Sequence, residues 1–262
     1  MKHIRTIIDK EWAEVFKNKM VLFTIIFMPL IFTAIPLVML GVTSGSAMAT
    51  GDSADFPPQF AAVCGDMSAG DCMVVYLMNQ FLILFMMMPL IIPITIAAYS
   101  IVGEKTTRSL EPLLATPITT AELLTGKNLA ATIPAVLATW VGFALFAVGS
   151  LIISGSRAVT ASLLDPMWLL AVLLVGPLMA VLSVNFSIMV SSRVNDPRVA
   201  EQVSTVVILP LLALFFGQIS GLFFLNKTLI LLIALGLVVV DISLIYLAVR
   251  MFQRENILTR WK

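Results

Sequence analysis

The stretch GEKTTRSLEPLLATPITTAELLTGK, residues 103–127, is the polar segment around which the rest of the sequence is arranged. It separates two long apolar runs and carries several charged residues: Glu104, Lys105, Arg108, Glu111, Glu122 and Lys127. Within it, Ser109 is a favourable N-cap, and Pro112 fits the first turn of a helix, where no N–H is needed. Pro117 ends that helix, because the residue before a proline is pushed out of the α conformation. The sequence therefore predicts a short helix between two apolar segments.

The predicted short helix has an apolar face. Leu110, Leu113 and Leu114 lie three and four positions apart, so they share one side of the helix. Beyond it, Thr119 and Glu122 have the spacing of a capping box, which predicts the start of the next helix.

The composition is that of an integral membrane protein. Of the 262 residues, 60% are hydrophobic and only 12% are charged, whereas about a quarter of the residues in a soluble domain are charged. The single histidine, His3, and the two cysteines leave no cluster of the kind that metal sites or Cys/His catalytic sites require. The net charge of +1 gives no basis for binding nucleic acid.

The hydrophobic residues gather in six segments, each long enough to cross a hydrocarbon core of about 30 Å. The predicted membrane spans are residues 20–42, 75–102, 124–153, 167–191, 200–224 and 228–250. Prolines interrupt the first five spans, either as kinks that allow the spans to bend or as ordinary tolerance of proline in membrane helices.

Lysine and arginine predict the orientation of the spans. If the N-terminus is cytoplasmic, fourteen of the sixteen Lys and Arg residues lie inside, and only Arg157 and Lys227 lie outside. Both termini and the loop of residues 103–123 are therefore predicted to be cytoplasmic, and residues 43–74 to form an extracytoplasmic loop.

Residues 1–19 have the pattern of an amphipathic helix. Apolar Ile4, Ile8, Trp12 and Val15/Phe16 form one stripe, with charged residues beside it. This pattern is typical of a helix that lies in the membrane interface. The alternative is a basic flank of the first span.

Three further residues and one cysteine pair carry separate hypotheses. Asp241 is a carboxylate deep in a span, where it either contributes to a transport pathway or has a structural role with a neighbouring hydroxyl or as a protonated acid. Gly217 and Gly221 are small residues four apart, a spacing that permits close backbone approach. Cys64 and Cys72 share the extracytoplasmic loop, where a disulfide is expected and two free thiols are the alternative.

The segment around residue 110 resembles the first cytoplasmic loop of ABC transporter type 2 permeases, which carries a motif like E-[RK]-E-x-G-T-L-E-x-L-x-x-[ST]-P. The matching residues are Glu104, Lys105, Leu110, Glu111, Leu113, Thr116 and Pro117, while Thr106, Arg108 and Ser109 depart from the motif. The resemblance covers essentially the whole chain. It implies an all-α membrane protein with six transmembrane helices, an N-terminal elbow helix, and a short cytoplasmic coupling helix between spans 2 and 3.

The resemblance also implies a function: the permease subunit of an ABC exporter, which pairs as a homodimer or with a sister permease. A separate ATPase, in two copies, would dock on this chain and hold the ATP and Mg²⁺, and no cofactor is expected on the chain itself. The implied docking residues are Glu104, Leu110, Glu111, Pro112, Leu113, Leu114, Thr116 and Pro117. The expected location is a prokaryotic inner membrane, in contact with lipid, and the expected cargo is a small or amphipathic molecule.

Two other classes of protein fit the sequence less well than the permease does. An ion-gradient-driven secondary transporter or channel usually carries several intramembrane ionisable groups or an internal repeat, and here one deep acid stands alone. An intramembrane enzyme needs a nucleophile with a base or metal ligands, and no H-E-x-x-H or G-x-S-x-G motif occurs. No G-x-x-x-x-G-K-[ST] phosphate-binding motif occurs either.

Overall fold

The computed structural model describes residues 2–45, 69–106, 118–154 and 157–251, and every regular element among them is a helix. The predicted coupling helix, Cys64, most of the 43–74 loop and the C-terminal tail lie outside the described residues. Six helical segments are long and apolar enough to cross a membrane, so the predicted all-α, six-span fold class is confirmed. These segments are Lys19–Val42, Gly70–Thr106, Thr120–Ser154, Val159–Ser191, Pro197–Ile219 and Lys227–Met251.

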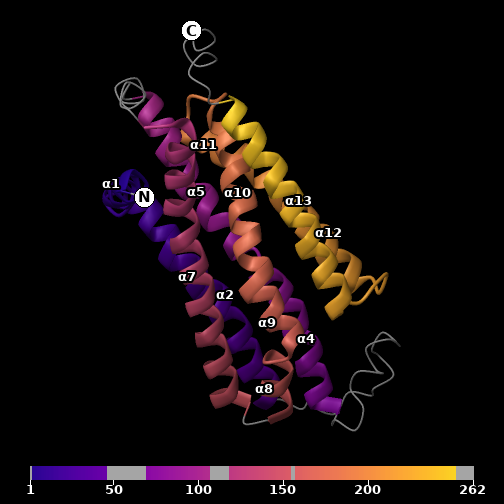
Figure 1. Ribbon diagram of the computed structural model, residues 1–262. Helices are drawn as coiled ribbons and strands as arrows, with labels where there is room; N and C mark the ends of the chain where they lie inside the picture. Colours follow the sequence, from indigo (N-terminus) through magenta and orange to yellow (C-terminus); the bar gives the residue numbers. More distant parts are fainter. Residues whose placement is uncertain (1, 46–68, 107–117, 155–156, 252–262) are drawn as a thin grey trace.

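The helices run alternately up and down an elongated bundle (Figure 1). In chain order they are α1 (Lys2–Val15), α2 (Lys19–Gly45), α4 (Ala69–Phe85), α5 (Met88–Thr106), α7 (Thr120–Ser154), α8 (Arg157–Leu163), α9 (Pro166–Leu170), the π-helix η3 (Ala171–Val175), α10 (Gly176–Ser191), α11 (Pro197–Ser204), the 3₁₀ turn η4 (Thr205–Ile208), α12 (Leu209–Ile219) and α13 (Lys227–Met251). The end of α5, the start of α7, α1, α11 and the end of α13 lie at one end of the bundle, which we call the loop end.

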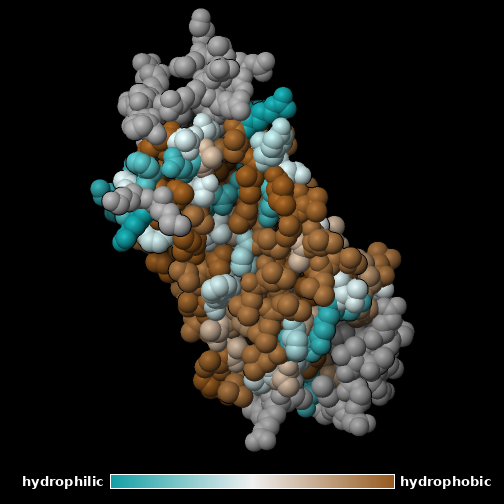
Figure 2. Space-filling view, viewed as in Figure 1, coloured by the Kyte–Doolittle hydropathy of each residue, from teal (hydrophilic) through white to brown (hydrophobic). Residues whose placement is uncertain are grey.

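The second span, α4 and α5, forms the centre of the bundle. In its most apolar 18-residue stretch, 78% is buried inside the protein, compared with 17% in the corresponding stretches of the first and sixth spans. α5 contacts α2, α7, α10 and α11, and α4 is separated from it by a turn at Met86 and Met87 just before Pro89. The outer helices expose large apolar residues, so hydrophobic surface covers the middle of the molecule and hydrophilic residues gather toward its ends, densely around α1 (Figure 2).

The fifth span ends earlier than predicted. The sequence predicts a span over 200–224, but α12 ends at Ile219 and residues 220–226 are not helical. Gly221 has φ of +72°, a left-handed conformation that glycine adopts readily and that ends the helix.

The N-terminal helix α1 lies across the bundle against α7 and α5. It buries Ile7, Glu11 and Val15, a stripe four residues apart, while Ile4, Ile8 and Trp12 of the predicted stripe are only partly buried. The face that α1 turns to the bundle therefore shares Val15 with the predicted apolar stripe and includes an acid, Glu11, that the sequence pattern gave no reason to place inside. Whether α1 also lies in the membrane interface stays a prediction.

Gly126 allows α1 to approach α7 closely. A Cβ at Gly126 would lie 2.8 Å from Ile7 Cγ2 and 2.9 Å from Ile7 Cβ, which is too close. A Cβ at Gly236 of α13 would meet nothing within 4 Å.

These two glycines make a matched test. We expect Gly126→Ala to lower the apparent melting temperature of the purified protein in detergent, because overpacking of about 1–3 kcal/mol exceeds the ~1 kcal/mol gain in helix propensity. Gly236→Ala should leave that temperature unchanged or raise it. Equal effects of the two substitutions would contradict the close contact between α1 and α7.

Candidate functional site

The predicted docking loop is described only at its two roots. Leu110, Glu111, Pro112, Leu113, Leu114, Thr116 and Pro117 lie outside the described residues, so their role stays a prediction. The roots are Glu104 near the end of α5 and Thr119 before the start of α7. The described part of the site therefore consists of the residues at these roots and their contacts.

The predicted capping box opens α7. The backbone N–H of Thr119 donates to Glu122 Oε2 at 3.0 Å, and the backbone N–H of Glu122 donates to Thr119 Oγ1 at 3.2 Å. The two side chains are also joined, Thr119 Oγ1 to Glu122 Oε2 at 2.9 Å. This reciprocal pair satisfies free N–H groups at the helix start and fixes where the loop ends.

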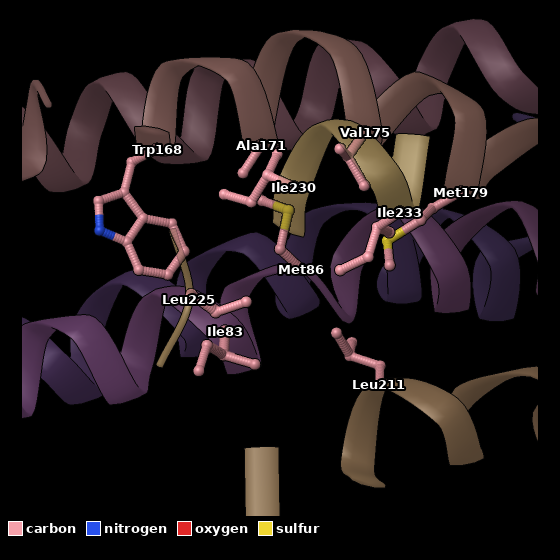
Figure 3. A pocket seen from close by; sticks show the side chains of 10 residues that line it. All are labelled: Ile83, Met86, Trp168, Ala171, Val175, Met179, Leu211, Leu225, Ile230 and Ile233. Carbon is pink, nitrogen blue, oxygen red and sulfur yellow. The ribbon is translucent and has the colours of Figure 1, made fainter. Parts of the chain in front are cut away.

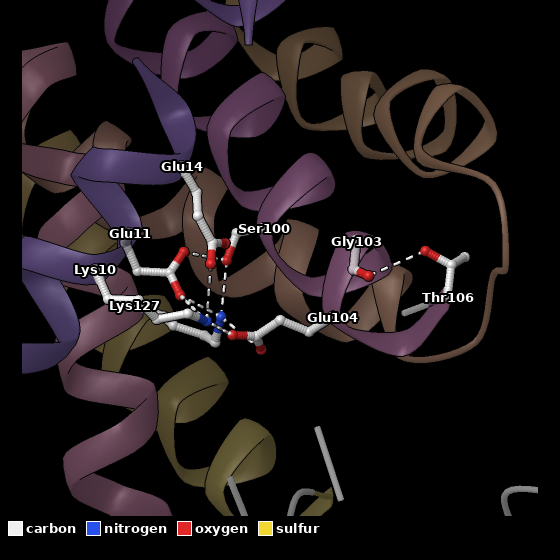
Figure 4. Close-up of polar contacts among 8 residues, drawn as sticks. All are labelled: Lys10, Glu11, Glu14, Ser100, Gly103, Glu104, Thr106 and Lys127. Atoms are coloured by element: carbon white, nitrogen blue, oxygen red, sulfur yellow. Dashed lines mark hydrogen bonds and ion pairs between the residues drawn. The ribbon is translucent and has the colours of Figure 1, made fainter. Parts of the chain in front are cut away.

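Five side chains from α1, the end of α5 and the start of α7 form a cluster that we call the ionic clamp: Lys10, Glu11, Ser100, Glu104 and Lys127 (Figure 4). At its centre, the Lys127 ammonium donates to Glu11 Oε1 at 2.7 Å and to Ser100 Oγ at 2.8 Å. It also forms an ion pair with Glu104 Oε2 at 2.8 Å. Ser100 Oγ in turn donates to Glu11 Oε2 at 2.5 Å. The clamp thus joins α1, α5 and α7.

The clamp is buried and balanced in charge. The side chains of Glu11, Glu104 and Lys127 are 2%, 3% and 5% exposed. Lys10, which is partly exposed, donates to Glu104 Oε1 and lies 3.7 Å from Glu11 Oε1. Two carboxylates therefore share two ammonium groups, which is the condition under which buried charges are tolerated.

The pKa values of Lys10 and Glu11, the two residues of the clamp on α1, are each shifted in the direction that favours the charged form. Burial by itself would raise the pKa of Glu11, but the Lys127 ammonium and the hydrogen bonds to Glu11 outweigh it and lower that pKa. Burial by itself would lower the pKa of Lys10, but its hydrogen bond and attraction to Glu104 outweigh it and raise that pKa. Both groups are thus charged at neutral pH.

Neighbouring residues extend the clamp to other helices. Lys105 donates to the backbone carbonyls of Ser192 and Val194, each at 3.3 Å, and so ties the end of α5 to the connection after α10. On α7, Asn128 Nδ2 donates to Asn185 Oδ1 of α10 at 2.9 Å. At each loop root, two adjacent residues therefore contact different parts of the bundle. Glu104 pairs with Lys127 of α7 while Lys105 contacts the connection after α10, and Lys127 pairs with Glu11 of α1 while Asn128 contacts α10.

The sequence singled out Glu104 for docking but missed Glu11 and Lys127 as partners in a site. The structure places the Glu104 carboxylate inside the clamp, and its predicted contact with an ATPase stays a prediction. The available signals were an acid on the same face of α1 as Ile7 and Val15 and a lysine within the start of an apolar span. Their pairing across 116 positions has no local signature.

Asp241 and the two glycines lie far from the loop roots in sequence. Asp241 is 4% exposed, and neither of its carboxylate oxygens has a hydrogen-bond partner among the described residues, so the hydroxyl partner of one prediction is not found there. A Cβ at Gly217 would lie 2.5 Å from Phe223 Cε1, so Gly217 makes room for the side chain after the turn at Gly221. Cys72 is disulfide-bonded, and its expected partner, Cys64, lies outside the described residues.

A small apolar cavity lies between α4, α9, η3, α10, α12 and α13 (Figure 3). It encloses about 40 Å³ and is lined by Ile83, Met86, Trp168, Ala171, Val175, Met179, Leu211, Leu225, Ile230 and Ile233. The lining includes residues from the π-helix and from the turn between α4 and α5, where regular helix geometry is interrupted. Gln80, one turn before Ile83, and Gln218 of α12 are buried with amide atoms that have no partner among the described residues. This volume is far below the roughly 300–1,000 Å³ of ligand pockets.

Lys127 is expected to be the residue on which the clamp depends. Lys127→Met leaves two buried carboxylates with only the partly exposed Lys10, and such a loss costs about 3–5 kcal/mol. We expect a marked fall in the apparent melting temperature in detergent. Lys10→Met should lower the melting temperature much less, because Glu104 keeps its ion pair with Lys127. Similar losses from the two substitutions would contradict the central place of Lys127.

The contact of α1 with α7 is expected to weaken in acid. The pKa of Glu11 is lowered on folding. Its contribution to the stability of the α1–α7 contact is therefore complete above the ordinary pKa of about 4.3 and is lost as the pH falls through the lowered pKa. Because the pKa of Lys10 is raised, its contribution persists up to about 10.4 and is lost above that. The rate of thiol labelling of buried Ile7→Cys, relative to exposed Asp9→Cys, should therefore stay low from pH 5 to 10 and rise below about pH 4. A constant ratio down to pH 3 would count against the clamp.

Comparison with protein families agrees with the resemblance seen in the loop motif. The model of the ABC-2 family transporter proteins matches residues 5–233, most of the chain and all of the clamp. No curated protein gives a significant match. With six apolar spans and a family match over most of its length, the chain belongs to the ABC-2 family transporter proteins and is a multi-pass membrane permease.

Proposed function

We propose that the chain is the membrane-spanning subunit of an ATP-driven exporter in a prokaryotic inner membrane, with both termini in the cytoplasm. Family membership supports the transport role. The distribution of Lys and Arg supports the orientation. Because the sequence has no G-x-x-x-x-G-K-[ST] motif, ATP and Mg²⁺ would be bound by a separate ATPase subunit.

The ATPase is proposed to dock on the loop of residues 103–123. The observation that carries this proposal is the ionic clamp, in which Glu104 from one loop root and Lys127 just beyond the other meet at 2.8 Å. A loop whose roots are held together and tied to three helices moves those helices when it moves. The apolar face of Leu110, Leu113 and Leu114 is the surface offered to the ATPase.

The working unit is proposed to contain two permease chains and two ATPase subunits. One six-span chain forms half of a pathway, so a second copy or a sister permease completes it. When ATP brings the two ATPase subunits together, their movement is passed through the two loops to the spans. This requires only that inward-facing and outward-facing states exist and that ATP favours one of them.

The proposed cargo is a small apolar or amphipathic molecule. The cavity between α4, α10 and α13 is lined entirely by apolar side chains, two of them methionines, which adapt to irregular shapes. At about 40 Å³ the cavity is closed to cargo in this conformation. Opening would therefore separate the helices that line it.

The docking role is tested by co-purification. The tagged chain should retain an ATPase, and Leu113→Asp combined with Leu114→Asp should lose most of it, because two carboxylates cannot be buried in an apolar contact. Asn195→Asp, which adds an acid on the other connection at the loop end, is the control and should retain the ATPase. Full retention by the double variant, at equal expression, would exclude this face as the docking surface.

A further inference from the structure

We propose that α1 is a moving part of the transport cycle: α1, the end of α5 and the start of α7 move as one rigid body, locked together by Lys127. This inference rests on the proposed function, since it concerns how the movement of the 103–123 loop reaches the spans. It assigns Glu11, Ser100 and Lys127 as positioning residues. None of them lies in the loop segment that carries the docking face.

The first step is the coordination of Lys127. The Lys127 ammonium donates hydrogen bonds to Glu11 Oε1 and Ser100 Oγ and forms an ion pair with Glu104 Oε2, all within 2.8 Å. These oxygens come from α1 and from two turns of α5. Any shift of α1 or α7 relative to α5 therefore breaks at least one charge-assisted contact.

The second step is the burial of the clamp. Glu11, Glu104 and Lys127 are nearly fully buried, so a broken contact is not replaced by hydration unless the site opens. Trp12 adds a bond from its indole N–H to the Ala130 carbonyl at 3.0 Å, and Ile7 fills the space above Gly126. Separation of α1 from α7 is thus opposed over almost two turns of α1, from Ile7 to Trp12.

The third step is the contrast with α13. This helix packs on α10 and η3 with apolar residues such as Ile230 and Ala234. Its buried Asp241 has no hydrogen-bond partner among the described residues. Apolar packing allows sliding at lower cost than the buried ion pairs of the clamp do. The relative motion is therefore expected between the clamped body and α13.

The experiment measures distances between spin labels on cysteines placed at exposed positions. One pair, Asp9→Cys with Thr125→Cys, spans α1 and α7 within the clamped body. A second pair, Asp9→Cys with Tyr246→Cys, spans α1 and α13. Each is measured in the isolated chain and in the complex with the co-purified ATPase, with and without ATP and vanadate.

We expect the α1–α7 distance to be narrow and unaffected by nucleotide, and the α1–α13 distance to shift when ATP and vanadate are added. In Lys127→Met the α1–α7 distribution should broaden and the nucleotide-dependent shift should be lost, while the ATPase still co-purifies. Lys127→Arg, which keeps the charge, should restore part of the shift, and Lys10→Met should behave like the parent chain. If Lys127→Met does not accumulate, Glu11→Gln replaces it, because it keeps the shape and removes one charge.

Two results would overturn the inference: a nucleotide-dependent change in the α1–α7 distance of the parent chain, or a folded clamp variant with an unchanged α1–α13 shift. Failure of the proposed function looks different. In that case no ATPase is recovered, yet the isolated chain still shows whether Lys127→Met broadens the α1–α7 distribution.

Discussion

The structure depends on one buried ammonium group. Lys127 sits where the chain leaves the 103–123 loop and enters its third span, and its charge is balanced by carboxylates from α1 and α5. A lone lysine in this position would make the start of α7 costly to bury. With Glu11 and Glu104 beside it, the same residue fixes the spacing of three helices. The polar loop is thereby joined to the apolar bundle by defined contacts rather than by a flexible connection.

The two ends of the bundle are held together differently. At the loop end, polar contacts join α5 to α1, α7 and the connection after α10, and α7 to α10. Farther along, the helices around the cavity meet mainly through apolar side chains, with one hydrogen bond from Trp168 Nε1 of α9 to Asn79 Oδ1 of α4. The buried amides of Gln80 and Gln218 have unpartnered atoms within the described chain. An end fixed by charge-assisted bonds suits the transfer of movement. A region of apolar packing with unsatisfied polar groups suits rearrangement.

Much of the fold could be predicted from sequence because it is set by local composition. The six spans follow from runs of apolar residues, and the start of α7 follows from Thr119 and Glu122. The end of α12 at Ile219 could not, because leucines and phenylalanines continue beyond the turn at Gly221. The clamp could not either, since it joins residues from three distant segments, and a pattern search treats Glu11 as part of a polar face. The docking surface itself lies outside the described residues and stays a prediction.

We propose that the 103–123 loop is the contact for a separate ATPase and that the clamp passes the movement of this loop to α1, α5 and α7. The most direct measurement is a cryo-EM comparison of the ATPase-bound complex with and without ATP and vanadate. The account predicts ATPase density against residues 110–117 in both states, with α1 and the start of α7 superposing when the two maps are aligned on the end of α5. An ATPase bound elsewhere, or an α1 that separates from α7 between the two states, would contradict it.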